Sequence, residues 1–346
     1  MLAAPSRAES KATRGARALM RATPAPAPAW WAPGPHLPTI FASTLRKMPM
    51  PPTTRVQWRT PDGDTLTIER IRGRLDAPRI VVFHGLEGGT RSAYARRLLH
   101  AARQRGWWAD LVLWRTCDGR AVNDVARAYH SGVSDDAGFA LERIHAEDPE
   151  RPTMLHGTSL GGNVLLKWLG ECGPSVPRSI KAAAAVSVPF DLAAASRRIE
   201  QGASAIYGIH FLRSLKRKAI AKAARFPGLC DSARVARART LREFDDAFTA
   251  PIHGFASAED YYEQSSSIRY LARIRTPTLL LSARNDPLLP AGVVDEVRSL
   301  TRENPVIECV FPEAGGHVGF FGGTVPGRPQ YWSESFAMDW LEIFTE

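Results

Sequence analysis

Residues 157–161 read GTSLG, a G-x-S-x-G pattern placed between a short apolar run at 153–156 and a helix-like stretch from Gly162. A serine in a strand-to-helix turn of this kind sits on a sharply bent, strained backbone that lifts its hydroxyl clear of the sheet edge. Side chains at the two glycines would collide where the strand and the helix pass closely. The pattern therefore predicts that Ser159 is a nucleophile.

A serine hydroxyl needs a base to take its proton, and the base needs an acid to fix its tautomer and stabilise its charged form. Nucleophile turns of this type are followed along the chain by an acidic residue and then by a histidine. Asp286 follows an apolar run at 278–282, and His317 lies in the later loop GGHVGF at 315–320. The predicted triad is therefore Ser159, Asp286 and His317.

Other residues compete for two of these roles. Asp191 also follows a predicted strand and could reach the same place as Asp286, so the identity of the acid stays open at this stage. His130 and His253 are alternative bases, but only His317 has the expected position after the last strand.

A hydrolytic serine also needs two preorganised backbone N–H groups for the oxyanion of its tetrahedral intermediate. The residue after the nucleophile, Leu160, is expected to supply one. The loop FHGLEGG at 83–89 follows a buried apolar run, and its Leu86 is expected to supply the other. His84 is interpreted as a structural histidine bonded to backbone. Glu87 has no assigned role, and either pairs with a nearby arginine or lines the mouth of the site.

Apolar periodicity places the elements that must hold these residues. Strands are predicted at 54–58, 65–71, 79–83, 109–113, 154–155, 182–188, 278–282 and 306–311, and helices at 93–105, 135–147, 162–170 and 338–344. This alternation predicts an α/β fold with a mainly parallel, doubly wound sheet that begins with a hairpin. The interval from 188 to 278 is far too long for a simple crossover, so residues 190–275 are predicted to form an inserted helical cap.

Composition sets the broad class. The 346 residues are 44% hydrophobic and carry a net charge of +10, which permits attraction to anionic surfaces without requiring it. The basic cap segment at 213–222 leaves weak peripheral membrane contact open. A nucleic-acid partner is not expected, because no aromatic groove is interleaved with the basic residues. No obligate protein partner is evident.

The four cysteines are scattered, without paired spacing. They predict no zinc or redox motif and a reduced, cytoplasmic protein, and no metal or organic cofactor is expected. The sequence contains no apolar run of about 18 residues, so no membrane-spanning segment is predicted. Residues 1–33, rich in Arg, Ala and Pro, are expected to be a disordered or mis-started extension before a domain at 34–346.

Several blocks together resemble the YheT-like family of α/β-hydrolases, a bacterial group related to eukaryotic α/β-hydrolase-domain lipases and carboxylesterases. The matching blocks are PHLPT (35–39), VVFHGLEGG (81–89), YHSG with the following acidic pair (129–136), GTSLGGN (157–163), REFDDAFTAPIHGF (242–255), YY (261–262), NDP (285–287) and GGHVGF (315–320). The resemblance implies the α/β-hydrolase fold and the triad Ser159, Asp286 and His317. It also implies hydrolysis of carboxylic esters, of short- or medium-chain acyl groups or lipids.

One departure from that family stands at 114–119, where relatives tend to have an Arg-Gly-Cys turn and this chain has Arg115-Thr116-Cys117. A threonine in place of glycine calls the shape of that loop into question, but not the triad.

The sequence is therefore interpreted as a serine carboxylesterase acting through an acyl-enzyme in lipid metabolism. An acyltransferase with the same triad is an alternative, because only the acceptor differs. A non-catalytic binding module on a hydrolase fold is the second alternative. A haloalkane dehalogenase is excluded, because it would need an aspartate where Ser159 stands.

Overall fold

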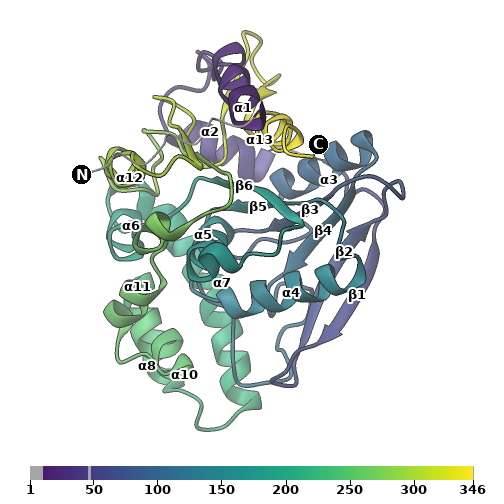
Figure 1. Cartoon of the computed structure of the whole chain (residues 1–346). Helices are drawn as coiled ribbons and strands as arrows, with labels where there is room; N and C mark the ends of the chain where they lie inside the picture. The colour runs from purple at the N-terminus through teal and green to yellow at the C-terminus, as the bar shows by residue number, and fades with distance from the viewer. Residues whose placement is uncertain (1–10, 46–47, 346) are drawn as a thin grey trace, which may run out of the picture.

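The computed structural model describes residues 11–45 and 48–345, and an eight-stranded sheet forms its centre (Figure 1). The strand order is β1-β2-β4-β3-β5-β6-β7-β8. The strands are β1 (Thr54–Arg59), β2 (Thr65–Ile71), β3 (Arg79–Phe83), β4 (Trp108–Leu113), β5 (Thr153–Thr158), β6 (Ile180–Val186), β7 (Thr278–Leu281) and β8 (Ile307–Val310). Strands β1 and β2 pair antiparallel, as do β2 and β4, and the other neighbours are parallel. The predicted hairpin and mainly parallel sheet are both present.

Helices cover both faces of the sheet because the strands bury side chains on both sides. On β3, Val81 and Phe83 join the core formed with α4 (Ser134–Glu147), α5 (Leu160–Cys172) and α12 (Val293–Thr301). The alternate residues Ile80 and Val82 join the core formed with α3 (Ala93–Arg105) and α13 (Ser333–Glu342). The central strand β3 is therefore buried on both faces, and the predicted doubly wound arrangement is confirmed.

The chain between β6 and β7 is helical. It contains α6 (Leu192–Ile199), α7 (Ala205–Arg225), α8 (Ser232–Arg237), α9 (Leu241–Phe244), α10 (Ala250–His253) and α11 (Ala258–Ser265), with short 3₁₀ and π turns between them. Leu212 of α7 and Phe244 of α9 belong to a small apolar core within this segment. In Figure 1 these helices extend from one end of the sheet. We refer to residues 190–275 as the cap.

The beginning of the chain differs from the expected disordered extension. Residues 11–22 form α1 (Lys11–Ala22), which lies beside the C-terminal helix α13 in Figure 1. A Cβ atom on Gly15 would lie 3.2 Å from Ile343, and Ala16 is 1% exposed. Helix α1 is stable here because its small apolar face packs beside α13. Residues 1–10 of the expected extension lie outside the described residues.

A short arm continues from α1 to β1. Trp31 stacks on Phe321 with a centroid distance of 5.4 Å, and its indole nitrogen donates to the carbonyl oxygen of Gly323 (3.1 Å). The block PHLPT then forms most of α2 (His36–Ile40). The small hairpin β9 (Phe321–Gly322) and β10 (Gln330–Tyr331), which the sequence did not predict, is the surface on which this arm lies.

Candidate active site

Ser159 stands between β5 and α5 with φ 54° and ψ −123°, a strained conformation for a residue with a side chain. The turn is tight because the helix crosses close to the neighbouring strand. A Cβ atom on Gly161 would lie 2.3 Å from the carbonyl oxygen of Phe83, so no side chain fits there. The sequence argument for a sharp turn at Ser159 agrees with this geometry.

Asp286 follows β7 and His317 follows β8, and the two side chains come together there. Nδ1 of His317 is 2.8 Å from Oδ2 of Asp286, and Asp286 is only 4% exposed. Asp191 instead accepts a hydrogen bond of 2.9 Å from the N–H of Ala194 and caps α6. Of the two acids that the sequence left open, Asp286 is the one placed against His317.

Ser159 and His317 line one apolar cavity with a volume of about 150 Å³. Leu86 and Leu160 lie on its wall, and the cap supplies much of the remainder. Among the apolar side chains that line it are Leu192, Ile199, Phe211, Leu215, Phe244, Phe248, Leu288 and Leu289. The cavity therefore joins the predicted nucleophile and base to an apolar space under the cap.

The loop that carries His317 is held by hydrogen bonds from its backbone N–H groups to three side chains. Oδ1 of Asn285 accepts the N–H groups of residues 315 and 316, each at 3.0 Å. The hydroxyl of Thr39 accepts the N–H of His317 itself at 2.8 Å, and Ser187 accepts the N–H of Val318 at 3.2 Å. Sequence reasoning missed Thr39 and Ser187, although the block PHLPT was a signal that residues 35–39 matter.

The loop after β3 is anchored on both sides of Leu86. The N–H of Gly85 donates to the hydroxyl of Tyr94 (2.8 Å), and the N–H of Glu87 donates to the hydroxyl of Tyr129 (2.9 Å). Within the described residues, the N–H of Leu86 has no protein acceptor. Leu160 is the first residue of α5, where N–H groups have no acceptor within the helix. Both predicted oxyanion donors are therefore residues that line the cavity.

His84 bonds to backbone on both sides of its ring, as interpreted from the sequence. Its Nδ1 donates to the carbonyl oxygen of Gly85 (2.8 Å), and its Nε2 accepts the N–H of Trp114 (3.2 Å). Complete burial lowers the pKa of His84 to about 4. A neutral histidine in this place shapes the loop that carries Leu86.

Glu87 pairs with a lysine of the cap, whereas the sequence suggested an arginine. Its carboxylate accepts hydrogen bonds from Lys218 (2.7 Å), Tyr129 (2.7 Å) and Ser214. Burial alone would raise the pKa of Glu87, but Lys218 and these donors hold it below its usual value. The ion pair ties the loop after β3 to helix α7, which no local sequence pattern indicated.

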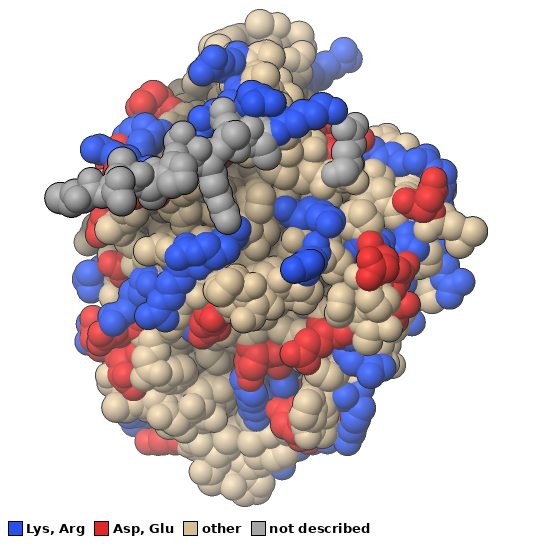
Figure 2. All heavy atoms as spheres, in the orientation of Figure 1, with Lys and Arg blue, Asp and Glu red and all other residues tan. Residues whose placement is uncertain are grey.

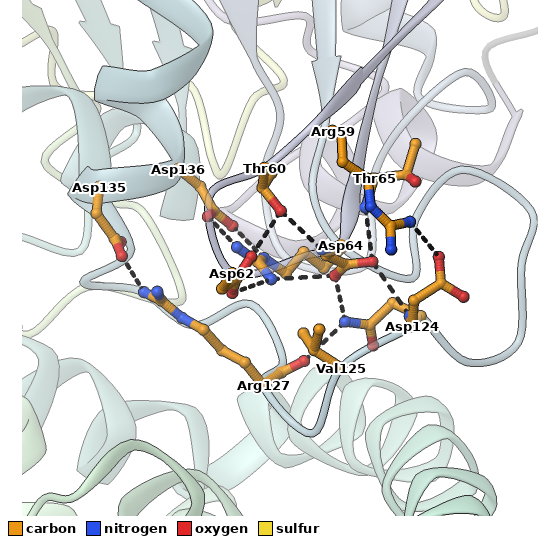
Figure 3. A network of polar contacts seen from close by, with 12 residues as sticks. Arg59, Thr60, Asp62, Asp64, Thr65, Asp124, Val125, Arg127, Asp135 and Asp136 are labelled. Carbon is orange, nitrogen blue, oxygen red and sulfur yellow. Dashed lines mark hydrogen bonds and ion pairs between the residues drawn. The ribbon is translucent and has the colours of Figure 1, made fainter.

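A buried arginine shapes the turn at 114–119. Arg115 forms a bidentate pair with Asp136 (2.6 and 2.7 Å) and also contacts Asp62 (2.7 Å) and Asp64 (3.0 Å). Figure 3 labels these three carboxylates within a network of polar contacts. The next residue, Thr116, has φ 67°, the left-handed region that favours glycine. The turn therefore keeps a glycine-type backbone although the residue is threonine, and Thr116 lines the cavity.

Two blocks without a derived role meet in the fold. The rings of His130 and His253 lie 4.4 Å apart between centroids, joining the loop before α4 to helix α10 of the cap. Burial lowers the pKa of His253 to about 3 and lowers that of His130 well below its usual value. Among the described residues, no hydrogen bond joins Ser159 to His130, His253 or His317, and His130 lines the same cavity as Ser159. Of these three histidines, His317 is the one that has a carboxylate partner.

Three further findings concern metal binding, membrane-spanning helices and surface charge. Among residues 11–45 and 48–345, no group of three His, Cys, Asp or Glu side chains could hold a metal ion. No helix of this part of the chain is long and apolar enough to cross a membrane. On the face drawn in Figure 2, basic and acidic side chains are interspersed, without one broad basic surface.

Comparison with known proteins gives concordant results. The family model described as the alpha/beta hydrolase fold matches residues 133–324. The chain is 40% identical over 316 residues to "Putative esterase YheT" of Escherichia coli, covering 90% of this chain and 91% of that protein. It is 28% identical over 287 residues to "Phospholipase ABHD3" of Mus musculus, covering 80% and 69%. A crystal structure of the Pyrococcus furiosus esterase Pf2001 superposes with a TM-score of 0.56 at 17% identity, covering 85% and 91% of the two chains, a likeness of fold alone.

Proposed function

The chain belongs to the YheT-like group of the α/β-hydrolase family, and on that premise we propose that it hydrolyses carboxylic esters through an acyl-enzyme on Ser159. The relatives named above support an ester hydrolase. The single observation that carries the proposal is the shared cavity of Ser159 and His317, with His317 bonded to Asp286.

The proposed mechanism assigns one role to each residue. Ser159 attacks the ester carbonyl while His317 takes its proton, and His317 then gives that proton to the leaving alcohol. Asp286 fixes the tautomer of His317 and stabilises its charged form. The N–H groups of Leu86 and Leu160 bind the oxyanion of each tetrahedral intermediate. In the second half of the reaction, His317 takes a proton from water, and the water oxygen attacks the acyl carbon. His317 then returns the proton to the oxygen of Ser159, and the carboxylic acid is released.

The size of the cavity suggests which acyl groups are used. Its volume of about 150 Å³ is that of an apolar protein cavity known to hold a benzene-sized group. We therefore expect acyl chains of roughly six carbons to fit best. Short- to medium-chain esters are the proposed substrates, and a cytoplasmic location stays a prediction.

The test is hydrolysis of p-nitrophenyl esters from acetyl to palmitoyl by the wild type and by Ser159→Ala. The wild type should show a maximum near six acyl carbons, and Ser159→Ala should lose at least about a thousandfold in kcat. Ser299→Ala is the matched control, because Ser299 is exposed on α12 and lines none of the described cavities.

Each other outcome has a clear meaning. Equal rates for the wild type and Ser159→Ala would reject Ser159 as the nucleophile. Turnover that requires an added alcohol acceptor would favour the acyltransferase alternative, because the acyl-enzyme step is common to both reactions. Absence of turnover with every ester and every acceptor would favour a binding module.

A further inference from the structure

A second hollow adjoins the apolar cavity and has the opposite character. Its volume is about 710 Å³, and it shares Thr116, Phe211 and Lys218 with the lining of the first cavity. The loop after β3, the turn at 114–121 and helix α7 form its walls. These shared residues place the hollow next to the cavity that Ser159 lines.

The lining of this hollow is strongly cationic. Five basic side chains and one carboxylate border it. They are Arg91, Arg120, Arg213, Arg217, Lys218 and Glu87. On the face of the molecule that Figure 2 shows, basic and acidic groups are interspersed. A concave surface with one sign of charge attracts anions of the opposite sign.

Two of these cations already have acidic partners. Lys218 is paired with Glu87, and Arg120 is paired with Asp118 (2.7 Å) and Asp124 (3.4 Å). Within the described residues, no carboxylate lies within ion-pair distance of Arg91, Arg213 or Arg217. Three guanidinium groups therefore face the hollow without a counter-charge.

Two of those guanidinium groups lie on one face of α7. Arg213 and Arg217 are four residues apart, which places them one turn apart on the same side of the helix. Both are exposed, and Arg217 makes only a long 3.4 Å contact with the hydroxyl of Ser214. Guanidinium groups bind phosphate oxygens through paired N–H donors, more specifically than ammonium groups do.

We propose that this hollow is a subsite for a phosphate group carried by the alcohol portion of the ester substrate. The inference rests on the proposed ester hydrolysis, because it places the acyl group in the apolar cavity and the alcohol in the hollow. Hydrolysis adds the oxygen of water to the acyl carbon and returns a proton to the alcohol oxygen, so the phosphate is unchanged. Arg213 and Arg217 bind the phosphate oxygens, and Arg91 adds to the positive electrostatic potential in the hollow.

The experiment compares two soluble esters with the same acyl chain, 1-hexanoylglycerol 3-phosphate and uncharged 1-hexanoylglycerol, both kept below the concentration at which they aggregate. The wild type should have about tenfold higher kcat/KM for the phosphorylated ester, and the difference should shrink in high salt. The double variant Arg213→Gln/Arg217→Gln should treat the two esters alike while keeping its rate on the uncharged one. Arg302→Gln, an exposed arginine that lines neither cavity, is the control.

The same measurements distinguish a soluble phosphorylated ester from one in a membrane, and failure of the subsite from failure of ester hydrolysis. Equal kcat/KM for both soluble esters in the wild type would overturn the subsite and leave ester hydrolysis standing. A preference seen only when the phosphorylated ester is embedded in phosphatidylcholine vesicles would also overturn it, because attraction to a charged surface would then explain the effect. If neither ester is hydrolysed, the proposed function fails.

Calorimetric titration with glycerol 3-phosphate tests the subsite without catalysis. The wild type and Arg302→Gln should bind it, and Arg213→Gln/Arg217→Gln should bind at least about tenfold more weakly. Equal binding by the double variant and the wild type, or no binding by the wild type, would overturn the proposal. Circular dichroism of the variants checks that the exposed positions on α7 tolerate glutamine.

Discussion

At the scale of single residues, the two acids that could orient His317 differ in what they already bind. Asp286 is 2.8 Å from Nδ1 of His317, whereas the carboxylate of Asp191 caps α6 through Ala194. An acid that serves as a helix cap has its oxygen committed to backbone. This difference separates a catalytic role from a stabilising one and can be measured.

We expect Asp286→Asn to lower kcat by roughly 10⁴-fold, because an amide at this place favours the wrong tautomer of His317. Asp191→Asn should keep kcat within about twofold, since asparagine is also a good helix cap, and Asp191→Ala should lose about 1 kcal/mol of unfolding free energy. Steady-state kinetics with the hexanoyl ester and urea unfolding measure both. A large loss of kcat in Asp191→Asn with Asp286→Asn active would exchange the two roles.

At the level of elements, the early helix α2 holds the loop that carries His317, near the end of the chain. The hydroxyl of Thr39, on α2, accepts the N–H of His317 and donates to the carbonyl oxygen of Pro35 (2.7 Å). A Cβ atom on Gly316 would lie 2.6 Å from that same carbonyl oxygen, so the loop and α2 pack without a gap. The arm therefore fixes the direction from which His317 approaches Ser159.

Thr39→Val removes this acceptor while keeping the shape of the side chain, so the N–H of His317 loses its partner. We expect kcat to fall about tenfold with KM nearly unchanged, because substrate binding does not involve the arm. Thr39→Ser should keep the kcat of the wild type, because serine retains the hydroxyl that accepts the N–H of His317. Thr44→Val is the control, since the hydroxyl of Thr44 donates to the carbonyl oxygen of Ile40 (2.6 Å) in its own helical segment. Equal kinetics in Thr39→Val and Thr44→Val would remove Thr39 from the site.

At the scale of the whole molecule, buried histidines link stability to pH. Burial lowers the pKa of His84 and His156 to about 4 and of His253 to about 3, and lowers that of His130 well below 6.5. The unfolded chain binds protons at these groups below pH 6.5 and the folded chain does not. The free energy of unfolding is therefore greatest above pH 6.5 and falls as the pH drops toward 4.

The expected loss between pH 7.5 and 5.5 is about 3–5 kcal/mol, at roughly 1 kcal/mol for each histidine. Asp245 opposes it, because burial raises the pKa of this carboxyl to about 6 and the folded protein binds a proton there that the unfolded chain does not. Urea unfolding at the two pH values measures the loss. His253→Gln should lose about 1 kcal/mol less than the wild type.

The exposed His210 provides the control for this pH dependence. His210→Gln should show the same loss of unfolding free energy as the wild type. An identical loss in His253→Gln would mean that His253 does not contribute, and a stability that rises toward pH 5.5 would contradict the whole account.

Much of the site could be predicted from sequence because its parts lie in local patterns. The turn at Ser159 needs small residues within two positions on either side, and the order of Ser159, Asp286 and His317 follows from the order of the strands. Strands β2, β3 and β7 and helix α3 stand close to where apolar periodicity placed them. Helix α1 was missed, because its Arg- and Ala-rich sequence resembles an unfolded tail until α13 is there to cover it.

Local patterns were enough to predict the fold class, the sharp turn at Ser159 and His317 as candidate base, since strand and helix periods and turn glycines act over a few residues. Three contacts became visible in the folded chain alone: Asp286 meets His317, Thr39 holds the loop of His317, and Lys218 pairs with Glu87 across 131 residues. These contacts join segments far apart in the chain. Sequence periodicity does not predict these contacts, because they depend on how whole layers of helices and strands pack and on which charged side chains are buried by that packing.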